Sequence, residues 1–265
     1  SYVVFSPSQI KLTTNLNPTA NEDIRYSLTD NKGRTLTKAQ QEFFKDSKVR
    51  DEQGRLLEVY HGTNAEFYAF NYSEAGTRGL VYGLGFYFTP KKSQAQRYGK
   101  TIKTVYLDIK KLANYGNYKN ITKIEWVNYL NFAKENVNSY IKGIWKGNSI
   151  SDIDYSSYEE SEDDMSLLRD FINGVAGGSN DVAIGYLEML KDSIGYDGAI
   201  INDTDGNPYI YIAFTPSQIK LTTNLNPTKN EDIRYSLSPS LKTKMKKYTK
   251  AESEAVINDI ITTKL

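Results

Sequence analysis

Three short groups of residues carry the side chains with which this chain could do chemistry. They are His61-Gly62-Thr63, a Phe-Tyr-Phe triplet centred on Tyr87, and a segment that ends in Tyr98. His61 is the only histidine and the chain has no cysteine, which excludes thiol nucleophiles, disulfides, iron–sulfur clusters and any metal site that needs two imidazoles. Because the two tyrosines lie only eleven residues apart, we expect them and the histidine to line one cleft.

Local sequence patterns position these groups on short strands and one helix. Residues 55–60 have a strand pattern after a turn, so His61 is expected at a strand end, where Gly62 lets a ligand approach the backbone closely. Residues 86–89 form the next expected strand, and a proline after it is suited to open a helix over residues 93–98. Taken alone, a histidine beside a glycine is more often a structural hydrogen-bonding residue than a catalytic one.

The rest of the chain combines short strands with a helical middle. The other expected elements are a helix at 38–45, a strand at 104–109, helical stretches at 124–141 and 165–194, and a hairpin of 197–201 with 209–214 across the turn 203–207. Strands before and after helices predict an α+β domain, with a helical insertion from about Leu112 to Ile194. The turn begins like a calcium loop but lacks the glutamate at the twelfth position, so we predict a plain hairpin turn.

Length and charge set further bounds. The 265 residues allow one large domain with appendages or two small ones. Lys and Arg total 33 against 32 for Asp and Glu, so the net charge of +1 gives no electrostatic reason to expect a polyanionic partner. The sequence has no apolar stretch of the length that a membrane span needs, and we expect no membrane partner.

One segment occurs twice. SPSQIKLTTNLNPTANEDIRYSL at residues 6–28 recurs as TPSQIKLTTNLNPTKNEDIRYSL at 215–237, and only Ser6/Thr215 and Ala20/Lys229 differ. A module duplicated in tandem predicts such a repeat. We therefore expect residues 1–36 to be the tail of a preceding module with a linker, 37–237 to be the domain, and 238–265 to be a basic linker with a C-terminal helix. The alternative is that both segments pack as clips on one domain.

The motifs taken together point to a known family. His-Gly-Thr, Gly-x-Gly-Phe-Tyr-Phe and Ser-x-x-x-x-Tyr resemble the nicotinamide-binding core of diphtheria-toxin-like and poly(ADP-ribose)-polymerase-like ADP-ribosyltransferases. Lys-Val-Arg-Asp before the histidine and Pro-Ser-Gln-Ile-Lys after the last strand make the chain most similar to the ADP-ribosyltransferase modules of phage and mobile-element polyvalent proteins. The resemblance covers residues 36–237. It implies a split β-sheet around an NAD cleft, with NAD as a substrate and no metal.

The resemblance also implies a role for each matching residue. His61 would hydrogen-bond the ribose of NAD, the Gly62 main chain would bind the nicotinamide carboxamide, and Thr63 would add a ribose contact. Tyr87 and Tyr98 would sandwich the nicotinamide ring, at roughly 0.5 to 1.5 kcal/mol per stacked pair.

Two further positions in the NAD site follow from the same resemblance. Residues 71–85 would form a donor loop over NAD, with Arg78 on a phosphate. Where related enzymes often carry a serine on the carboxamide, this chain has Ala95, and Ser93 or Thr89 is the expected substitute. Losing one neutral hydrogen bond costs only about 0.5 to 1.5 kcal/mol, so this departure weakens NAD binding without forbidding it.

The third catalytic position of the family falls on Ile210. Related enzymes usually have a glutamate there, on the strand before Pro-Ser-Gln-Ile-Lys, and its absence resembles the His-Tyr-Ile arrangement of mono-ADP-ribosyltransferases. Polymer synthesis is therefore not expected. Asp203 or Asp205 is a nearby acid that an active enzyme would use, and a one-residue shift would put Tyr209 in the slot instead.

The predicted function is transfer of one ADP-ribose from NAD to a macromolecular acceptor, a protein rather than a nucleic acid, with release of nicotinamide. The alternatives are an NAD glycohydrolase and a non-catalytic NAD-binding or structural module of a multidomain phage protein. By the same resemblance, the domain would be a toxin-like, monomeric part of a longer chain, located in the cytoplasm of a bacterial host.

Overall fold

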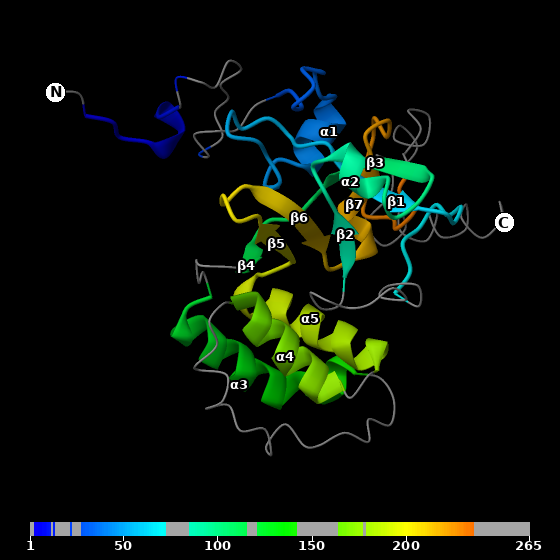
Figure 1. The fold of residues 1–265 in the computed structure, drawn as a ribbon. Coiled ribbons are helices and arrows are strands. Elements are labelled where there is room, and N and C mark those ends of the chain that lie inside the picture. The colour runs from blue at the N-terminus through cyan, green and yellow to red at the C-terminus, as the bar shows by residue number, and fades with distance from the viewer. Residues whose placement is uncertain are drawn as a thin grey trace, which may run out of the picture.

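The computed structural model describes residues 3–11, 13, 22, 28–72, 85–115, 121–141, 164–176 and 179–235. Its strands form two separate sheets (Figure 1). The three-stranded antiparallel sheet has the order β1 (Val59–Thr63), β3 (Thr101–Leu107), β7 (Ile219–Leu221). The four-stranded sheet has the order β2 (Phe86–Phe88), β6 (Pro208–Ala213), β5 (Gly198–Asn202), β4 (Leu112–Tyr115). Tyr60 and Thr89 form an isolated antiparallel bridge between the first strands of the two sheets.

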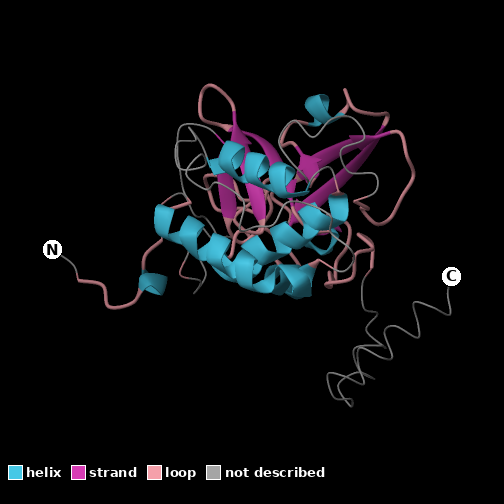
Figure 2. Cartoon of the chain, turned by 90° about the horizontal axis from the view of Figure 1, so that it is seen from below, coloured by secondary structure: helices cyan, strands magenta, loops and turns pink. Residues whose placement is uncertain are grey.

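The α-helices are α1 (Lys38–Phe43), α2 (Lys92–Ala95), α3 (Lys123–Tyr140), α4 (Asp164–Ala176) and α5 (Asn180–Ile194). Helices α3 to α5 lie together at one end of the molecule and α1 lies at the other, while α2 packs beside the strands (Figures 1 and 2). Together α3 to α5 form one layer that covers the four-stranded sheet, so the predicted α+β class with a split sheet and a helical middle is confirmed.

Residue alternation along the strands produces three apolar layers. On β6, Ile210 and Ile212 face the helices α3 to α5, whereas Tyr211 and Ala213 face the three-stranded sheet, because successive strand residues point to opposite faces. On β3, Tyr106 points the other way, into a smaller cluster with Phe44 of the α1 end. Each sheet is therefore packed on both faces.

The ends of the helices show why the sequence starts and stops them there. Thr122 is the N-cap of α3 and exchanges hydrogen bonds with Glu125 in a capping box. Ser179 caps α5, and that helix ends at Gly195, whose φ of 84° suits a left-handed C-terminal residue.

Several expectations about element bounds were wrong, and three of them bear on the site. β1 covers Val59–Thr63 rather than residues 55–60, so His61 lies in the middle of the strand, because pairing with β3 sets its limits. The helix after β2 ends at Ala95, so Tyr98 follows it in a turn. Leu112 begins a strand, β4, and not the helical insertion, because it pairs in parallel with Gly198 of β5. Because β4 and β5 are far apart in the sequence, the residues around Leu112 give no local signal of this parallel pairing.

The predicted hairpin is confirmed. β5 and β6 pair antiparallel across a turn in which Asp203 Oδ1 accepts hydrogen bonds from the main-chain N–H groups of Asp205 and Asn207. In this Asx turn the aspartate side chain accepts hydrogen bonds from the main chain of the turn itself, and this role explains the acidic residue there without a metal.

The segment before α1 belongs to the packed structure. Asp30 is fully buried and accepts a hydrogen bond from the Tyr106 hydroxyl, and Leu36 packs in the same cluster as Tyr106. The packed part of the chain therefore begins ahead of the boundary at residue 36 that we predicted.

Candidate active site

His61 lies between the two sheets. It is the third residue of β1, and its ring Nδ1 is 2.9 Å from the main-chain oxygen of Tyr87 on β2. The rings of Phe70 and Phe88 lie 5.0 and 5.6 Å from the imidazole, centroid to centroid. A carbonyl oxygen only accepts, so Nδ1 carries the proton in this contact, and in the neutral ring Nε2 is left as a hydrogen-bond acceptor.

The surroundings of His61 keep the ring neutral. Burial lowers the pKa of His61, and the positive charge of Lys103 lowers it further, while the hydrogen bond to Tyr87 acts in the opposite direction. Lys103 lies directly across the β1–β3 pair from His61 and donates from Nζ to the Phe67 main-chain oxygen. A neutral imidazole with a free acceptor lone pair suits a ligand hydroxyl better than an anion.

Gly62 is required by packing as well as by its expected ligand role. A Cβ at this position would lie 1.8 Å from the main-chain oxygen of Ala95, so α2 approaches β1 more closely than any side chain allows. The same Cβ would lie 3.3 Å from the Cβ of Tyr98. At Gly99 a Cβ would lie 2.1 Å from the carbonyl carbon of Thr63. Two glycines thus bring the segment that holds Tyr98 against the His-Gly-Thr strand.

Tyr87 and Ile210 share one face of the four-stranded sheet. Tyr87 pairs with Ile212 on β6, and Ile210 is two residues away on the same face of that strand. The half-buried ring of Tyr87 and the 9% exposed Ile210 both pack with the cluster beneath α3 to α5. The expected third catalytic position is therefore occupied by a residue of the hydrophobic core, and Tyr209 beside it is half-buried against the same cluster.

The remaining predicted residues have other partners or other positions. Thr63 Oγ1 accepts from the Ala65 N–H, and the buried Thr89 hydroxyl donates to Gln94 Oε1 at 2.8 Å, so Thr89 is a poor substitute for the missing serine. Ser93 is exposed on α2. Arg78 lies outside the described residues.

The two acidic candidates lie on the β5–β6 turn. Asp203 uses Oδ1 within the turn, and its Oδ2 is 4.0 Å from Lys91 Nζ, next to the start of α2. Asp205 is exposed at the tip of the turn. The turn therefore reaches the segment between β2 and Tyr98, which leaves Asp203 as the better positioned of the two.

The sequence interpretation missed the aromatic and basic residues around the histidine. Phe67, Phe70 and Lys103 surround His61, and none was singled out. The aromatic run Phe67-Tyr68-Ala-Phe70 soon after the glycine was an available signal. Lys103 was not predictable, because its position opposite His61 depends on strand register.

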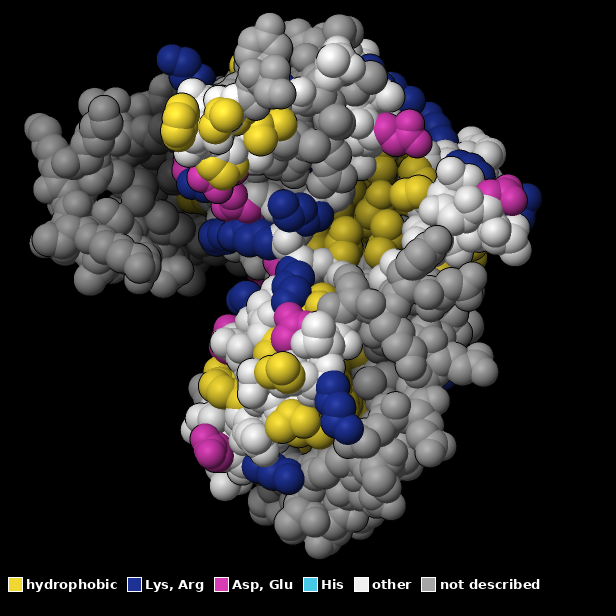
Figure 3. Space-filling model, turned by 90° about the vertical axis from the view of Figure 1, so that its left-hand side faces the viewer, with side chains coloured by type: hydrophobic (Ala, Val, Ile, Leu, Met, Phe, Trp, Pro, Cys, Tyr) yellow, Lys and Arg dark blue, Asp and Glu magenta, His cyan; other side chains and the backbone are white. Residues whose placement is uncertain are grey.

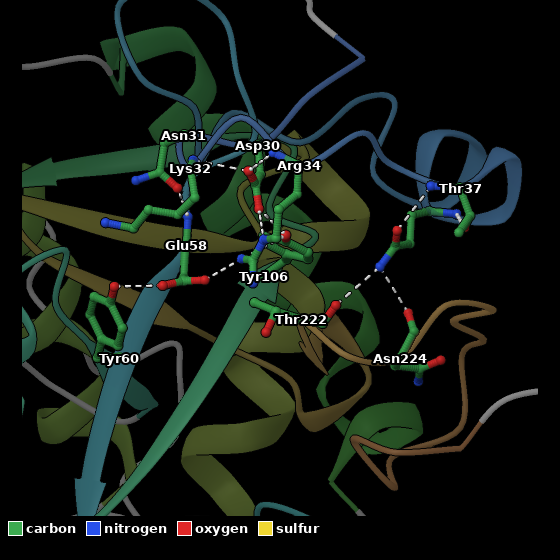
Figure 4. A network of polar contacts seen from close by, with 11 residues as sticks. Asp30, Asn31, Lys32, Arg34, Thr37, Glu58, Tyr60, Tyr106, Thr222 and Asn224 are labelled. Carbon is green, nitrogen blue, oxygen red and sulfur yellow. Dashed lines mark hydrogen bonds and ion pairs between the residues drawn. The ribbon is translucent and has the colours of Figure 1, made fainter.

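A polar network behind β1 holds the strand that carries His61 (Figure 4). The Tyr60 hydroxyl donates to Glu58 Oε1 at 2.6 Å, and Arg34 contacts the other Glu58 oxygen as well as Asp30. Burial and the hydrogen bond to Glu58 raise the pKa of Tyr60 to about 12, so this hydroxyl stays protonated and acts as a donor. The network fixes the backbone from which His61 projects.

Neither a metal-ligand cluster nor a membrane-spanning helix is found among the described residues. Within the described ranges no group of three or more acidic, histidine or cysteine residues is arranged to hold a metal ion. No helix in the described part of the chain is long and apolar enough to cross a bilayer. On the face shown in Figure 3, basic and acidic side chains are interspersed around hydrophobic ones, in keeping with the near-zero net charge.

Comparisons with known proteins add one strong match. A family model described as ADP-ribosyltransferase in polyvalent proteins matches residues 51–229, more than half of the chain. A crystal structure of an anti-CRISPR protein is 16% identical and aligns over 61% of this chain and 90% of that one, but with a TM-score of 0.28 it says nothing about fold or function. No curated protein matches the sequence.

Proposed function

The chain belongs to the family of ADP-ribosyltransferases in polyvalent proteins, and from this premise we propose that it is a mono-ADP-ribosyltransferase that uses NAD. In the reaction, the bond between the nicotinamide nitrogen and C1 of the ribose breaks, and nicotinamide leaves with the bonding electrons. A nucleophilic atom of the acceptor forms the new bond to C1 and loses a proton. The acceptor we propose is a macromolecule, a protein rather than a nucleic acid.

The hydrogen bond from His61 Nδ1 to the Tyr87 main chain is the observation that best supports this proposal. It orients a neutral imidazole whose Nε2 is an acceptor for a ribose hydroxyl. Tyr98, 53% exposed beside Gly62, supplies an accessible aromatic face for the nicotinamide ring. In our proposal Thr63 and Ser93 add polar contacts to NAD, and Arg78 binds a phosphate.

Bond cleavage in this site would rely on positioning. As nicotinamide leaves, positive charge develops on the ribose, which needs geometric restraint and electrostatic support more than a strong base. The core position of Ile210 offers no carboxylate for chain elongation, so a single transfer is the expected outcome. Asp203 is the residue we propose to assist the acceptor.

The buried Ile210 also favours a second candidate, a module that binds NAD without turnover. Incubation with NAD labelled on the adenine side in a host lysate separates the possibilities, with nicotinamide release and label transfer both followed. Label on a macromolecule in the wild type and not in His61→Gln supports the transferase. Nicotinamide release without label indicates a glycohydrolase, and binding of NAD by the folded protein without either signal indicates the non-catalytic module.

Two variants make that experiment sharper. Asp203→Asn removes the charge and keeps a side-chain oxygen for the turn, so an active-site role predicts lost transfer with an unchanged melting temperature. Asp205→Asn is the matched control on the same turn, because Asp205 is exposed and is only a main-chain donor to Asp203.

A further inference from the structure

The repeated segment has two very different environments. The C-terminal copy completes the domain, because Ile219 and Ile233 within it are buried, as is Phe214 directly before it. The residues that correspond to Phe214 and Ile219 are Phe5, directly before the N-terminal copy and 93% exposed, and Ile10, which is 48% exposed. The C-terminal copy thus fills a slot in the fold, by which we mean its place against β3 and α1. The described part of the N-terminal copy shows the same apolar side chains to solvent.

Main-chain and amide contacts hold the C-terminal copy in this slot. Gln218 Nε2 donates to the main-chain oxygens of Asp108 and Asp197 at 3.1 and 2.8 Å. Gln40 of α1 donates to the main-chain oxygens of Thr222 and Asn224. Figure 4 shows these two contacts beside the Arg34 network. All these contacts would be available to the N-terminal copy, which has the same residues at the corresponding positions.

The described turn of the N-terminal copy already has the shape of its counterpart in the slot. Its turn Pro7–Gln9 begins at Ser6 with φ and ψ of −134° and 134°, and the turn Pro216–Gln218 begins at Thr215 with −131° and 144°. In each turn the glutamine side chain accepts from the N–H of the capping residue, at 3.1 and 2.9 Å. A segment that is ordered before it docks loses less entropy on docking.

The two differing positions have unequal consequences. At the first, Ser6 and Thr215 both offer a hydroxyl, and each contacts the serine two residues on. At the second, Lys229 Nζ lies 2.9 Å from Oδ2 of Asp108, whose side chain is 2% exposed. The N-terminal copy has Ala20 there, which has no charge to offer. Ala20 itself lies outside the described residues.

Asp108 is sensitive to this difference because it is buried. Its Oδ1 has no hydrogen-bond partner among the described residues, so Oδ2 carries the pairing of the carboxylate. A buried carboxylate that loses its direct partner is strongly disfavoured. Burial, and to a lesser extent the positive charge of Lys229, lower the pKa of Lys220 to about 8, so part of the benefit of Lys229 is offset by repulsion between the two amines.

We propose that the Lys229–Asp108 ion pair selects which copy of the repeated segment occupies the slot, and that the N-terminal copy is a competent second occupant held out by its alanine. The choice between the two copies would then depend on one charge, that of Lys229. The shared contacts bind either copy, and the buried carboxylate disfavours the copy that has alanine in place of its direct lysine partner. This inference is independent of any catalytic activity.

Cysteine trapping tests the proposal in the full chain, because the natural sequence has no cysteine. Thr222 donates its N–H to the oxygen of Thr104 on β3, and Thr13 is the residue that corresponds to Thr222 in the N-terminal copy. Opposed residues of such a pair lie about 5.5 Å apart, within reach of a disulfide. In the triple variant T13C/T104C/T222C the two copies compete for the single thiol introduced on β3, and mass spectrometry of the linked peptides gives the ratio of occupancies.

The matched comparison adds either Ala20→Lys or Ala20→Met to that triple variant. Before the thiols are oxidised, each protein is equilibrated at a temperature at which the two copies can exchange in the slot. Lysine and methionine both add a long stem, but only lysine adds the charge. We expect Ala20→Lys to raise the ratio of the 13–104 link to the 104–222 link by about tenfold or more over Ala20→Met, as a hydrogen bond to a charged group implies. Lys229→Met should raise it as well. Equal ratios for the two Ala20 variants, or no 13–104 link in any of them while the 104–222 link forms, would overturn the proposal.

Discussion

The ring of His61 and the main-chain oxygen of Tyr87 form a hydrogen bond that joins the two sheets through a titratable group. The bond requires a proton on Nδ1, while burial and Lys103 disfavour a second proton on Nε2. Stability and ligand binding are therefore linked to pH at this residue.

We expect acid to destabilise the protein through His61. Its folded pKa lies below the unfolded value of about 6.5, so the unfolded state binds more protons in the interval between the two values. The contribution of His61 is complete above pH 6.5 and is lost as the pH falls below it. Urea unfolding of wild type and His61→Gln between pH 5 and 8 measures this, and identical pH slopes in the two proteins would contradict it.

Gly62→Ala should be among the most damaging small substitutions in the domain. The new methyl would meet a main-chain oxygen at 1.8 Å, so α2 or β1 has to move, at a cost of about 1 to 3 kcal/mol or more. Gly206→Ala is the control, since its methyl meets nothing within 4 Å and only its φ of 82° is strained. Thermal melts should show the larger loss at Gly62, and an equal or smaller loss there would refute the close packing of α2 on β1.

Tyr98 should affect NAD affinity without affecting stability. Because its side chain is about half exposed, Tyr98→Ala removes little core packing, but it removes the proposed stacking face and about 0.5 to 1.5 kcal/mol of binding free energy. Tyr98→Phe keeps the ring and should bind NAD like the wild type. Calorimetric titration with NAD compares the three proteins, and full affinity in Tyr98→Ala would remove Tyr98 from the site.

Ile210→Glu should not give the protein an ability to synthesise chains of ADP-ribose. The side chain is in the core beneath the helices, where an ionised carboxylate loses its hydration and fills the space of the isoleucine poorly. We expect a loss of at least about 2 kcal/mol in the free energy of unfolding, as for other truncating or polar changes in cores. Chemical denaturation of Ile210→Glu beside Ile210→Val tests this, and a wild-type midpoint for the glutamate variant would show that the position opens to solvent.

The sequence was informative wherever a feature is local. The hairpin around Asp203 could be predicted from its turn residues, and helix α1 from its helix-forming composition, since both signals span only a few positions. The α+β class followed from the order of strands and helices.

Features that depend on distant pairing were not predictable. β4 pairs in parallel with β5, and the sequence of residues 112–115 alone does not distinguish it from the helical region that follows. The surroundings of His61 depend on the β1–β3 register, which sets Lys103 opposite the ring. Whether Ile210 faces a ligand or the core also depends on which face of β6 the helices cover, and that is a property of tertiary packing.

The slot described above also bears on how the chain folds. Gln40 hydrogen-bonds Asn224, so this contact closes a loop of 184 residues, and Ile219 and Ile233 complete the core between the sheets only when the last segment arrives. Contacts so far apart in sequence are slow to form, because loop-closure entropy is lost before any stabilising contact is gained. During synthesis the ribosome must therefore release nearly the whole domain before its central core can close, and until then the apolar faces of β3 and β6 are open to other chains.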